Sequence, residues 1–373
     1  MTERQRIIPI QPGRESPLRP ARDSAGQGRG PGAIHDGRGR SLRDLRISVI
    51  DQCNLRCRYC MPREVFHDGY VYLSRQQMLS FDEIVRIASC FTQLGVQKIR
   101  LTGGEPLLRK QLESLVSQLA PLKTLEGQPV ELALTTNGLL LAQKAKALAE
   151  AGLHRVTVSL DAIHPDRFQQ MADTPGAHAQ IVLDGIAQAK AVGLRLKANM
   201  VVQRGANEDE ILPMAAAFRA LGVSLRFIEF MDVGSSNDWS LQHVVPSAEI
   251  VRRINSQWPI ERVGREVASE VSERWRYKDG QGEIGLISSV TAPFCGDCSR
   301  ARLSAEGGLY TCLFAHQGVD LRPLIRSGLK DDEIRSVLAG CWEGRTDRYS
   351  EIRAELQASG QRRPKVEMSY IGG

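Results

Sequence analysis

The stretch LRISVIDQCNLRCRYC, residues 45–60, joins a β-rich run to a short loop with three cysteines. Its first part, Leu45–Ile50, has the β-branched and apolar residues of a buried strand. Cys53, Cys57 and Cys60 follow within eight residues, with the spacing Cys-x3-Cys-x2-Cys. Thiolates are suitable ligands for iron–sulfur clusters or zinc, so this loop predicts a metal site at the end of a strand.

The same rhythm of a β-rich run followed by a helical pattern repeats along the chain. Five more strands are predicted, at Lys98–Thr102, Glu131–Thr135, Arg155–Leu160, Arg195–Val202 and Leu225–Phe230. Amphipathic helices are predicted around them, at Phe81–Leu94, Gln111–Leu122, Leu140–Ala151, Ile181–Val192 and Glu208–Leu221. Strands that alternate with helices form parallel sheets, so an α/β fold is expected.

Periodicity does not separate a doubly wound sheet from part of a barrel, but the placement of polar motifs does. Gly103–Pro106 follows the second predicted strand, Thr135–Gly138 ends the third, and Ser159–Asp161 ends the fourth. In a barrel, such loops meet over one mouth, where these folds keep their chemistry. We predict an incomplete (β/α)6 barrel of the TIM type with a C-terminal extension, which begins near residue 245 where the rhythm ends.

Composition excludes several classes of protein. The chain has 373 residues, 42% of them apolar, which is enough for a large buried core. No apolar run approaches the roughly 18–20 residues of a membrane span, and no signal segment follows the start. Eight Arg and four acids in residues 1–40 supply +4 of the net charge of +6, so the rest is nearly neutral. We expect a cytoplasmic protein that binds neither membranes nor nucleic acid.

Residues 1–40 are rich in Gly, Pro and Arg and have almost no apolar periodicity, which predicts a disordered leader. An organelle transit peptide is the alternative for this segment. We divide the remainder into a partial barrel at 41–245, a second region at 246–350, and a tail at 351–373 that ends in Gly372–Gly373.

Six of the eight cysteines fall into two sets of three, because Cys295, Cys298 and Cys312 form a second group. Cys90 and Cys341 stand alone in helical patterns and are predicted to be core residues. A closed structural metal site takes four ligands, so a set of three leaves one metal position open for a small molecule. His316 lies four residues after Cys312, so a structural zinc with three Cys and one His remains an alternative for the second set.

The chain resembles the radical S-adenosylmethionine superfamily in its Cys-x3-Cys-x-Tyr-Cys loop and in the Gly-Gly-Glu-Pro turn after the second predicted strand. Within that superfamily it is similar, from residue 41 to residue 373, to the GTP 3′,8-cyclases of molybdenum-cofactor biosynthesis. The segments that carry this second resemblance are RDLR at 43–46, CMP at 60–62, KIRLTGGEPL at 98–107, TTNG at 135–138, VSLDA at 158–162, RFIEFMDVG at 226–234, the second cysteine set and the Gly-Gly end.

The resemblance implies two [4Fe–4S] clusters, one on each cysteine set, and S-adenosyl-L-methionine on the open iron of the first. The region at 246–350 would then carry the auxiliary cluster and bind GTP. The implied activity is that of a lyase that converts GTP to (8S)-3′,8-cyclo-7,8-dihydroguanosine 5′-triphosphate. In the reaction that the resemblance implies, a deoxyadenosyl radical would remove hydrogen from the ribose C3′ of GTP, and the carbon radical would then attack guanine C8.

Site residues follow from the same matching of segments. For S-adenosylmethionine these are Tyr59, Gly104, Ser159 and Met231. For GTP they are Arg46, Arg100, Thr135, Lys197, Arg300 and Arg302. Gly372 and Gly373 are expected to reach into the active site as catalytic residues, because glycines can pass close to a bound nucleotide.

The resemblance also implies partners. They are an electron donor, a cyclic pyranopterin monophosphate synthase that receives the product, and a second copy of the chain in a homodimer. Two other interpretations stay open. One is a radical enzyme that modifies peptides and carries an auxiliary cluster, and the other is a binding module without enzymatic activity that is held together by a structural zinc.

Overall fold

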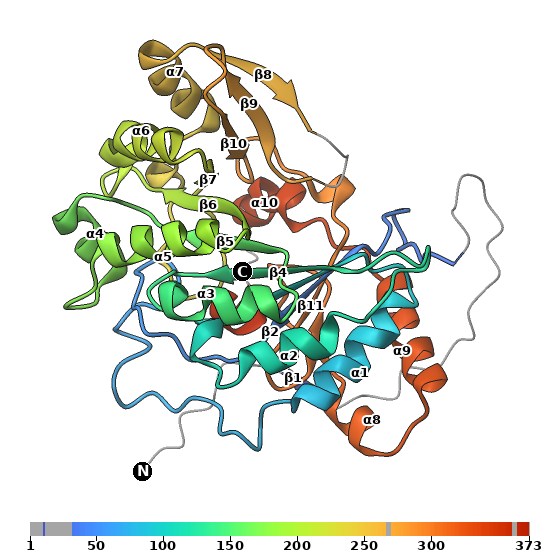
Figure 1. The fold of residues 1–373 in the computed structure, drawn as a ribbon. Helices are drawn as coiled ribbons and strands as arrows, with labels where there is room; N and C mark the ends of the chain where they lie inside the picture. The colour runs from blue at the N-terminus through green and yellow to red at the C-terminus, as the bar shows by residue number, and fades with distance from the viewer. Residues whose placement is uncertain (1–9, 12–31, 266–269, 360–363, 373) are drawn as a thin grey trace.

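The computed structural model of the protein describes residues 10–11, 32–265, 270–359 and 364–372 (Figure 1). Parallel strands β2 to β7 form the centre of its sheet and pair in chain order. Their bounds are β2 Asp44–Ser48, β3 Lys98–Thr102, β4 Glu131–Thr136, β5 Arg155–Ser159, β6 Arg195–Val202 and β7 Ser224–Glu229. The predicted strands are confirmed to within two residues at each end.

Helices α1 to α6 connect these strands and follow one another along the outside of the sheet (Figure 1). Their bounds are α1 Phe81–Thr92, α2 Leu112–Leu119, α3 Leu141–Glu150, α4 Pro165–Ala172, α5 Ala179–Ala191 and α6 Ile211–Leu221, with 3-10 turns η1 Pro106–Leu108 before α2 and η2 Glu208–Glu210 before α6. Helix α4 is absent from the predictions because only three of its eight residues are apolar, too few to display an apolar period.

The alternation along the central strands explains how the site is built. In β3, Ile99 and Leu101 are fully buried in the apolar core, whereas Arg100 between them lines a pocket on the other face. In β2, Leu45 and Ile47 are likewise buried in the core, and Arg46 between them in the sequence lines the pocket. Successive side chains of a strand point to opposite faces, so one face carries the core and the other carries the charges.

The C-terminal part of the chain extends the same sheet at both sides. Strand β10 (Glu283–Ile287) pairs parallel with β7, and β11 (Arg300–Leu303) pairs parallel with β2. Beyond them lie β8 Ile260–Gly264 and β9 Glu273–Tyr277 on one side, and β12 Gly308–Tyr310, β13 Gly318–Asp320 and β1 Ile10–Gln11 on the other. The fold is therefore the predicted incomplete barrel with an extension, and β10 and β11 flank its six central strands.

The remaining helices belong to this extension and to the tail. They are η3 Leu241–His243, α7 Ser247–Gln257, η4 Cys295–Asp297, α8 Arg322–Arg326, α9 Asp331–Glu343, α10 Tyr349–Ala358 and α11 Met368–Ile371. Cys90 is buried and Cys341 packs against the same core, as predicted for the two isolated cysteines. None of the helices in the described ranges is long and apolar enough to cross a bilayer.

The prediction of a disordered leader is wrong for residues 32–40. Asp36 and Arg40 are only 6% and 5% exposed, and His35 forms a β-bridge with Ser41. Ion pairs and hydrogen bonds to distant residues order this segment, and a lack of apolar periodicity does not reveal them. Within the rest of the predicted leader, Ile10–Gln11 pairs with β13, while 1–9 and 12–31 lie outside the described residues. The predicted boundaries at 245 and 350 stay predictions.

Candidate active site

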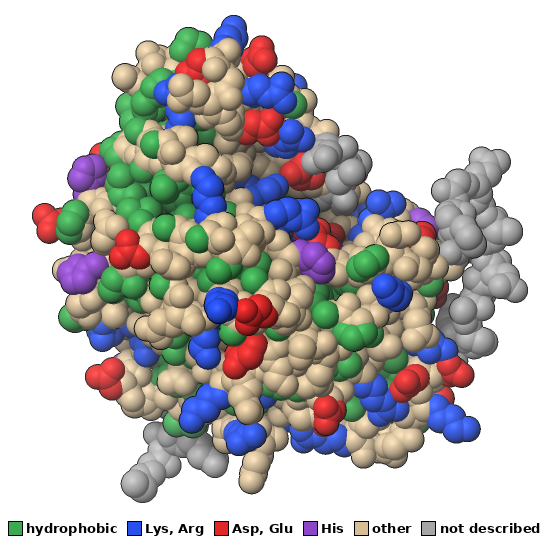
Figure 2. Space-filling view, in the orientation of Figure 1, with side chains coloured by type: hydrophobic (Ala, Val, Ile, Leu, Met, Phe, Trp, Pro, Cys, Tyr) green, Lys and Arg blue, Asp and Glu red, His purple; other side chains and the backbone are tan. Residues whose placement is uncertain are grey.

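A pocket inside the sheet and at the carboxyl ends of the central strands brings both cysteine sets together. Lys and Arg side chains lie around the hollow beneath the lobe that holds β8 and β9 (Figure 2). The predicted site residues that line the pocket are Arg46, Cys53, Cys57, Tyr59, Cys60, Arg100, Gly104, Thr135, Ser159, Met231, Cys295, Cys298, Arg300, Arg302 and Cys312. Residues that are up to 266 positions apart in the chain, Arg46 and Cys312, thus share one cavity.

The first cysteine set lies on the loop that leaves β2. The backbone of Gly104 donates to the carbonyl of Ile50 at 2.8 Å, and that of Glu105 donates to Gln52 at 2.9 Å, so the turn after β3 holds this loop. A Cβ on Gly103 would collide with the carbonyl of Ile50, and one on Gly104 with that of Gln52. The two glycines are therefore required by the close approach of two backbones.

Carboxylates surround the first set. Burial raises the pKa of the Cys53 thiol to about 11, and the charge of Glu105 adds to this effect. The pKa values of Cys57 and Cys60 also lie above the ordinary range, again mainly because of burial. These thiols are protonated in the metal-free protein at neutral pH, and binding of iron must displace their protons.

Asp161, Asn137 and Asn199 were not among the predicted site residues, although Asp161 and Asn137 lie in segments quoted above. The Tyr59 hydroxyl donates to Asp161 Oδ2 at 2.7 Å, and Asn137 Nδ2 lies 3.8 Å from Cys53 Sγ. Asn199 lines the pocket, and its buried Oδ1 has no hydrogen-bond partner within the described part of the chain. Its position inside β6 gives no signal in the sequence, since polar residues also occur on the exposed faces of strands.

A row of arginines crosses three neighbouring strands. Arg302 of β11 stands opposite Arg46 of β2, and Arg46 stands opposite Arg100 of β3. Enclosure in the pocket lowers the pKa of all three guanidinium groups, and for Arg46 the charges of Arg302, Arg300 and Arg100 add to the effect. Cations that destabilise one another in this way form a ready site for a polyanion.

Thr135 and Lys197 differ in their relation to this row. Arg100 Nη1 donates to Thr135 Oγ1 at 3.0 Å, so Thr135 orients a member of the row. Lys197 is not among the residues that line the pocket and forms an ion pair with Glu270 at 3.9 Å. Burial and the nearby charge of Arg226 lower its pKa to about 8.

The second cysteine set comes from two segments, the η4 turn and the loop after β12. Arg300 Nη2 donates to Cys298 Sγ at 3.4 Å. Burial opposes ionisation of the Cys298 thiol, but the charges of Arg300 and Arg345 outweigh it and lower its pKa to about 6. Cys298 therefore lies beside cations that favour its thiolate, whereas burial and the charge of Asp347 raise the pKa of Cys312 to about 12.

The C-terminal tail closes one side of the pocket. Met368 and Ser369 of α11 line it, and the carbonyl of Gly372 accepts a hydrogen bond from Arg302 Nη1. Gly372 has a φ of +72°, and a Cβ there would collide with Thr102. Gly373 lies outside the described residues, so its predicted role stays a prediction.

The residues present fit iron–sulfur clusters. Each set offers three thiols to the pocket, whereas His316, the fourth ligand of a structural zinc site, is not among the residues that line it. Within the described ranges, no group of three His, Cys, Asp or Glu is arranged to hold a single metal ion. The buried Asn199 oxygen, which has no partner in the described part of the chain, leaves a hydrogen-bond acceptor free for a small molecule in this pocket.

The chain matches two family models and several known proteins over most of its length. Residues 47–218 match the model of the Radical SAM superfamily, and residues 223–351 match that of Molybdenum Cofactor Synthesis C. The chain is 49% identical to the GTP 3′,8-cyclase of Acidothermus cellulolyticus, with 91% of this chain and 99% of that protein covered. It is 51% identical to the GTP 3′,8-cyclase of Xanthomonas axonopodis pv. citri, with the same coverage.

A solved structure with a similar fold is Streptococcus suis SuiB bound to precursor peptide SuiA. It has a TM-score of 0.46 and 17% identity, and the match covers 58% of this chain and 45% of that chain.

Proposed function

The chain belongs to the GTP 3′,8-cyclase family of radical S-adenosylmethionine enzymes, and we propose that its two cysteine sets act on one nucleotide held between them. The protein is an enzyme of the first step of molybdenum-cofactor biosynthesis. It converts GTP to (8S)-3′,8-cyclo-7,8-dihydroguanosine 5′-triphosphate with S-adenosylmethionine and iron–sulfur clusters as cofactors.

The observation that carries the proposal is the row formed by Arg302, Arg46 and Arg100 in the pocket that both cysteine sets line. A triphosphate carries several negative charges, and the planar guanidinium group binds phosphate oxygens in pairs. These arginines, with Arg300 and Thr135, would hold the triphosphate. Lys197 would join them only after its ion pair with Glu270 breaks.

Cys53, Cys57 and Cys60 would hold the first cluster, and Cys295, Cys298 and Cys312 the second. When bound, the first cluster and S-adenosylmethionine supply the radical that removes hydrogen from ribose C3′. Gly104, Tyr59, Ser159 and Met231 would hold S-adenosylmethionine against the first set. The protein itself contributes orientation, positive charge along the phosphates and the exclusion of water from the radical.

The tail would complete the nucleotide site. The carbonyl of Gly372 accepts a hydrogen bond from Arg302, so the tail fixes a guanidinium group that we assign to GTP. Gly372 and Gly373 would lie against the reacting nucleotide, and we assign them a catalytic role in this sense.

Partners are part of the proposal. An electron donor must reduce the first cluster, and a cyclic pyranopterin monophosphate synthase would take up the product. We propose that the protein acts in the cytoplasm, since clusters and their thiols persist in a reducing compartment. We also propose that it forms a homodimer. The division into 41–245 for the radical chemistry, 246–350 for the second cluster and GTP, and 351–373 for the tail belongs to the same proposal.

The test is anaerobic incubation of the reconstituted enzyme with a reductant, S-adenosylmethionine and GTP, followed by mass spectrometry. We expect 5′-deoxyadenosine and one cyclised nucleotide in equal amounts, and about eight iron atoms per chain from two cubane clusters. Cofactor cleavage without consumption of GTP would support the peptide-modifying alternative instead. Zinc with little iron would support the binding module.

A further inference from the structure

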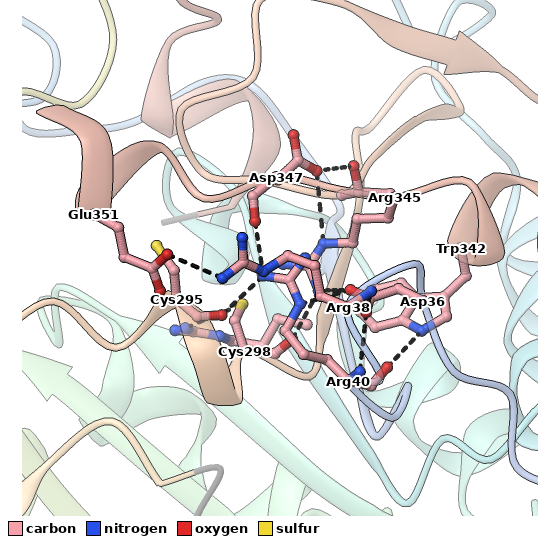
Figure 3. Close-up of polar contacts among 11 residues, drawn as sticks. Asp36, Arg38, Arg40, Cys295, Cys298, Trp342, Arg345, Asp347 and Glu351 are labelled. Carbon is pink, nitrogen blue, oxygen red and sulfur yellow. Dashed lines mark hydrogen bonds and ion pairs between the residues drawn. The ribbon is translucent and has the colours of Figure 1, made fainter. Parts of the chain in front are cut away.

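Residues 35–41 form a closed turn that packs against the second cysteine set (Figure 3). The backbone of Asp36 donates to the carbonyl of Arg40 at 3.0 Å, and that of Gly39 donates to the carbonyl of Asp36 at 2.9 Å. The side chains of Asp36 and Arg40 are 0% and 3% exposed. A turn buried in this way is part of the site rather than a free end of the chain.

Asp36 holds this turn together and joins two arginines. Its Oδ1 accepts from the backbones of Arg38 and Arg40, both at 2.9 Å. Its Oδ2 accepts from Arg40 Nε at 2.6 Å and from Arg345 Nη1 at 3.2 Å. One carboxylate thus faces two guanidinium groups, and the further carboxylate of Asp347 lies 3.6 Å from Arg345 Nε and is 36% exposed. A charge this deeply buried is retained only where partners fix it.

The two arginines reach the second cysteine set through its backbone (Figure 3). Arg40 Nη1 donates to the carbonyls of Cys295 at 2.8 Å and Asp347 at 2.7 Å. Arg345 Nη1 donates to the carbonyl of Cys298 at 2.7 Å. Both ends of the η4 turn, which presents two of the three thiols, are therefore held by side chains that Asp36 orients.

The arginines also bring charge to the pocket. Both line it, and Arg40 Nη2 is buried without a hydrogen-bond partner in the described part of the chain. The Trp342 indole donates to the carbonyl of Arg40 at 3.1 Å, and the Arg345 guanidinium lies 4.5 Å from the Trp342 ring centroid. Trp342 thus holds both cations in position, and the N–H group at Arg40 Nη2 remains free for a sulfur ligand.

We propose that Asp36, Arg40 and Arg345 are the positioning residues of the second iron–sulfur cluster. The arginines fix the Cys295–Cys298 turn and balance the thiolate charge, and Asp36 fixes the arginines. This inference rests on the proposed second cluster. Outer partners that orient metal ligands typically change metal affinity by about 10–100-fold when they are removed.

The test uses two backgrounds that separate the clusters. Replacement of Cys53, Cys57 and Cys60 by Ala leaves only the second set, and replacement of Cys295, Cys298 and Cys312 by Ala leaves only the first set. Each background, reconstituted anaerobically with iron and sulfide, should hold about four iron atoms per chain. Asp36→Asn is introduced into both, because it removes the charge and keeps the size of the side chain.

We expect D36N to lose iron to a chelator about 10–100-fold faster in the background with only the second set, and at the parent's rate in the other. Equal rates for D36N and its parent in the second-set background would overturn the proposal. Equal acceleration in both backgrounds would also overturn it, since that is the behaviour of a general loss of structure. A second-set background that binds no cluster at all would refute the second cluster itself, and the inference with it.

Arg40→Lys extends the test to a spectroscopic signature. Lysine keeps the charge but does not reproduce the three hydrogen bonds that the Arg40 guanidinium group donates to Asp36, Cys295 and Asp347. We expect altered g-values of the reduced second cluster by electron paramagnetic resonance, and unchanged g-values in R40K would contradict the proposal. The matched control is Arg38→Ala, because the Arg38 side chain lies in the same turn, is 32% exposed and pairs with Glu351, which is 30% exposed.

Discussion

The two cysteine sets present the same three ligands, but one thiol of each, Cys53 and Cys298, lies in opposite electrostatic surroundings. Cys53, Cys57 and Cys60 lie on one loop among buried carboxylates, and the pKa of Cys53 rises to about 11 through burial and the charge of Glu105. Cys298 lies beside Arg300 and Arg345, and its pKa falls to about 6. Arg300, which we assign to GTP, thus donates to a thiol of the second set, whereas the cation that acts on Cys53 is Arg56.

The contrast is sharpest when one set is removed at a time. Replacement of Cys53, Cys57 and Cys60 by Ala should abolish formation of 5′-deoxyadenosine, because no other group supplies the radical. Replacement of Cys295, Cys298 and Cys312 should keep slow cleavage of S-adenosylmethionine but stop cyclisation of GTP. Chromatography with mass spectrometry measures both products, and identical losses in the two variants would refute this division of roles.

Arg46→Met tests whether the arginine row serves an anion. Methionine fills a similar volume without charge, so the affinity for GTP should fall by about 1.5–3 kcal/mol, or roughly 10- to 150-fold in Kd. Because its neighbours repel Arg46, we expect the GTP-free variant to unfold no more easily than the parent. Anaerobic equilibrium dialysis and thermal unfolding check the two effects. Lys146→Ala, at a side chain 79% exposed, is the control, and a change of Kd under twofold in R46M would contradict the assignment.

Alkylation of the metal-free protein should separate Cys298 from Cys53 by pH. Only the thiolate reacts, so labelling of each cysteine rises with pH through its pKa. We expect a midpoint near pH 6 for Cys298 and near pH 11 for Cys53, on either side of the ordinary thiol. Iodoacetamide labelling followed by peptide mass spectrometry gives both midpoints in one sample. Arg300→Gln should raise the midpoint of Cys298 and leave that of Cys53 unchanged, and a common midpoint for both would argue against the contrast.

Gly372→Ala should have the smallest effect, because it disturbs the tail and neither cluster. The left-handed backbone costs a residue with a Cβ about 1–2 kcal/mol, and the new atom also collides with Thr102. We expect full iron content and cyclisation slowed by up to about tenfold. Gly127→Ala is the matched control, since Gly127 has a similar φ of +75° and no atom near the added Cβ. Equal rates for the two variants would exclude a role for the tail.

Much of the barrel can be predicted from the sequence, since the period of apolar residues is local. The range Lys98–Thr102 is predicted and observed with the same bounds, and the polar residues at strand ends do meet in one pocket. The contacts of Asp36 with Arg345 were beyond prediction, because 309 residues separate them and no motif links them. The row of Arg302, Arg46 and Arg100 depends on the pairing of β11 with β2, which no local pattern records.

The most direct test of the central claim, that both sets serve one bound nucleotide, uses GTP carrying deuterium at ribose C3′. Mass spectrometry of the 5′-deoxyadenosine formed in a single turnover reports where its added hydrogen came from. If GTP lies between the two sets, 5′-deoxyadenosine gains one deuterium for each nucleotide cyclised. Unlabelled 5′-deoxyadenosine formed alongside unchanged GTP would show that the radical does not reach the nucleotide, and would contradict the account.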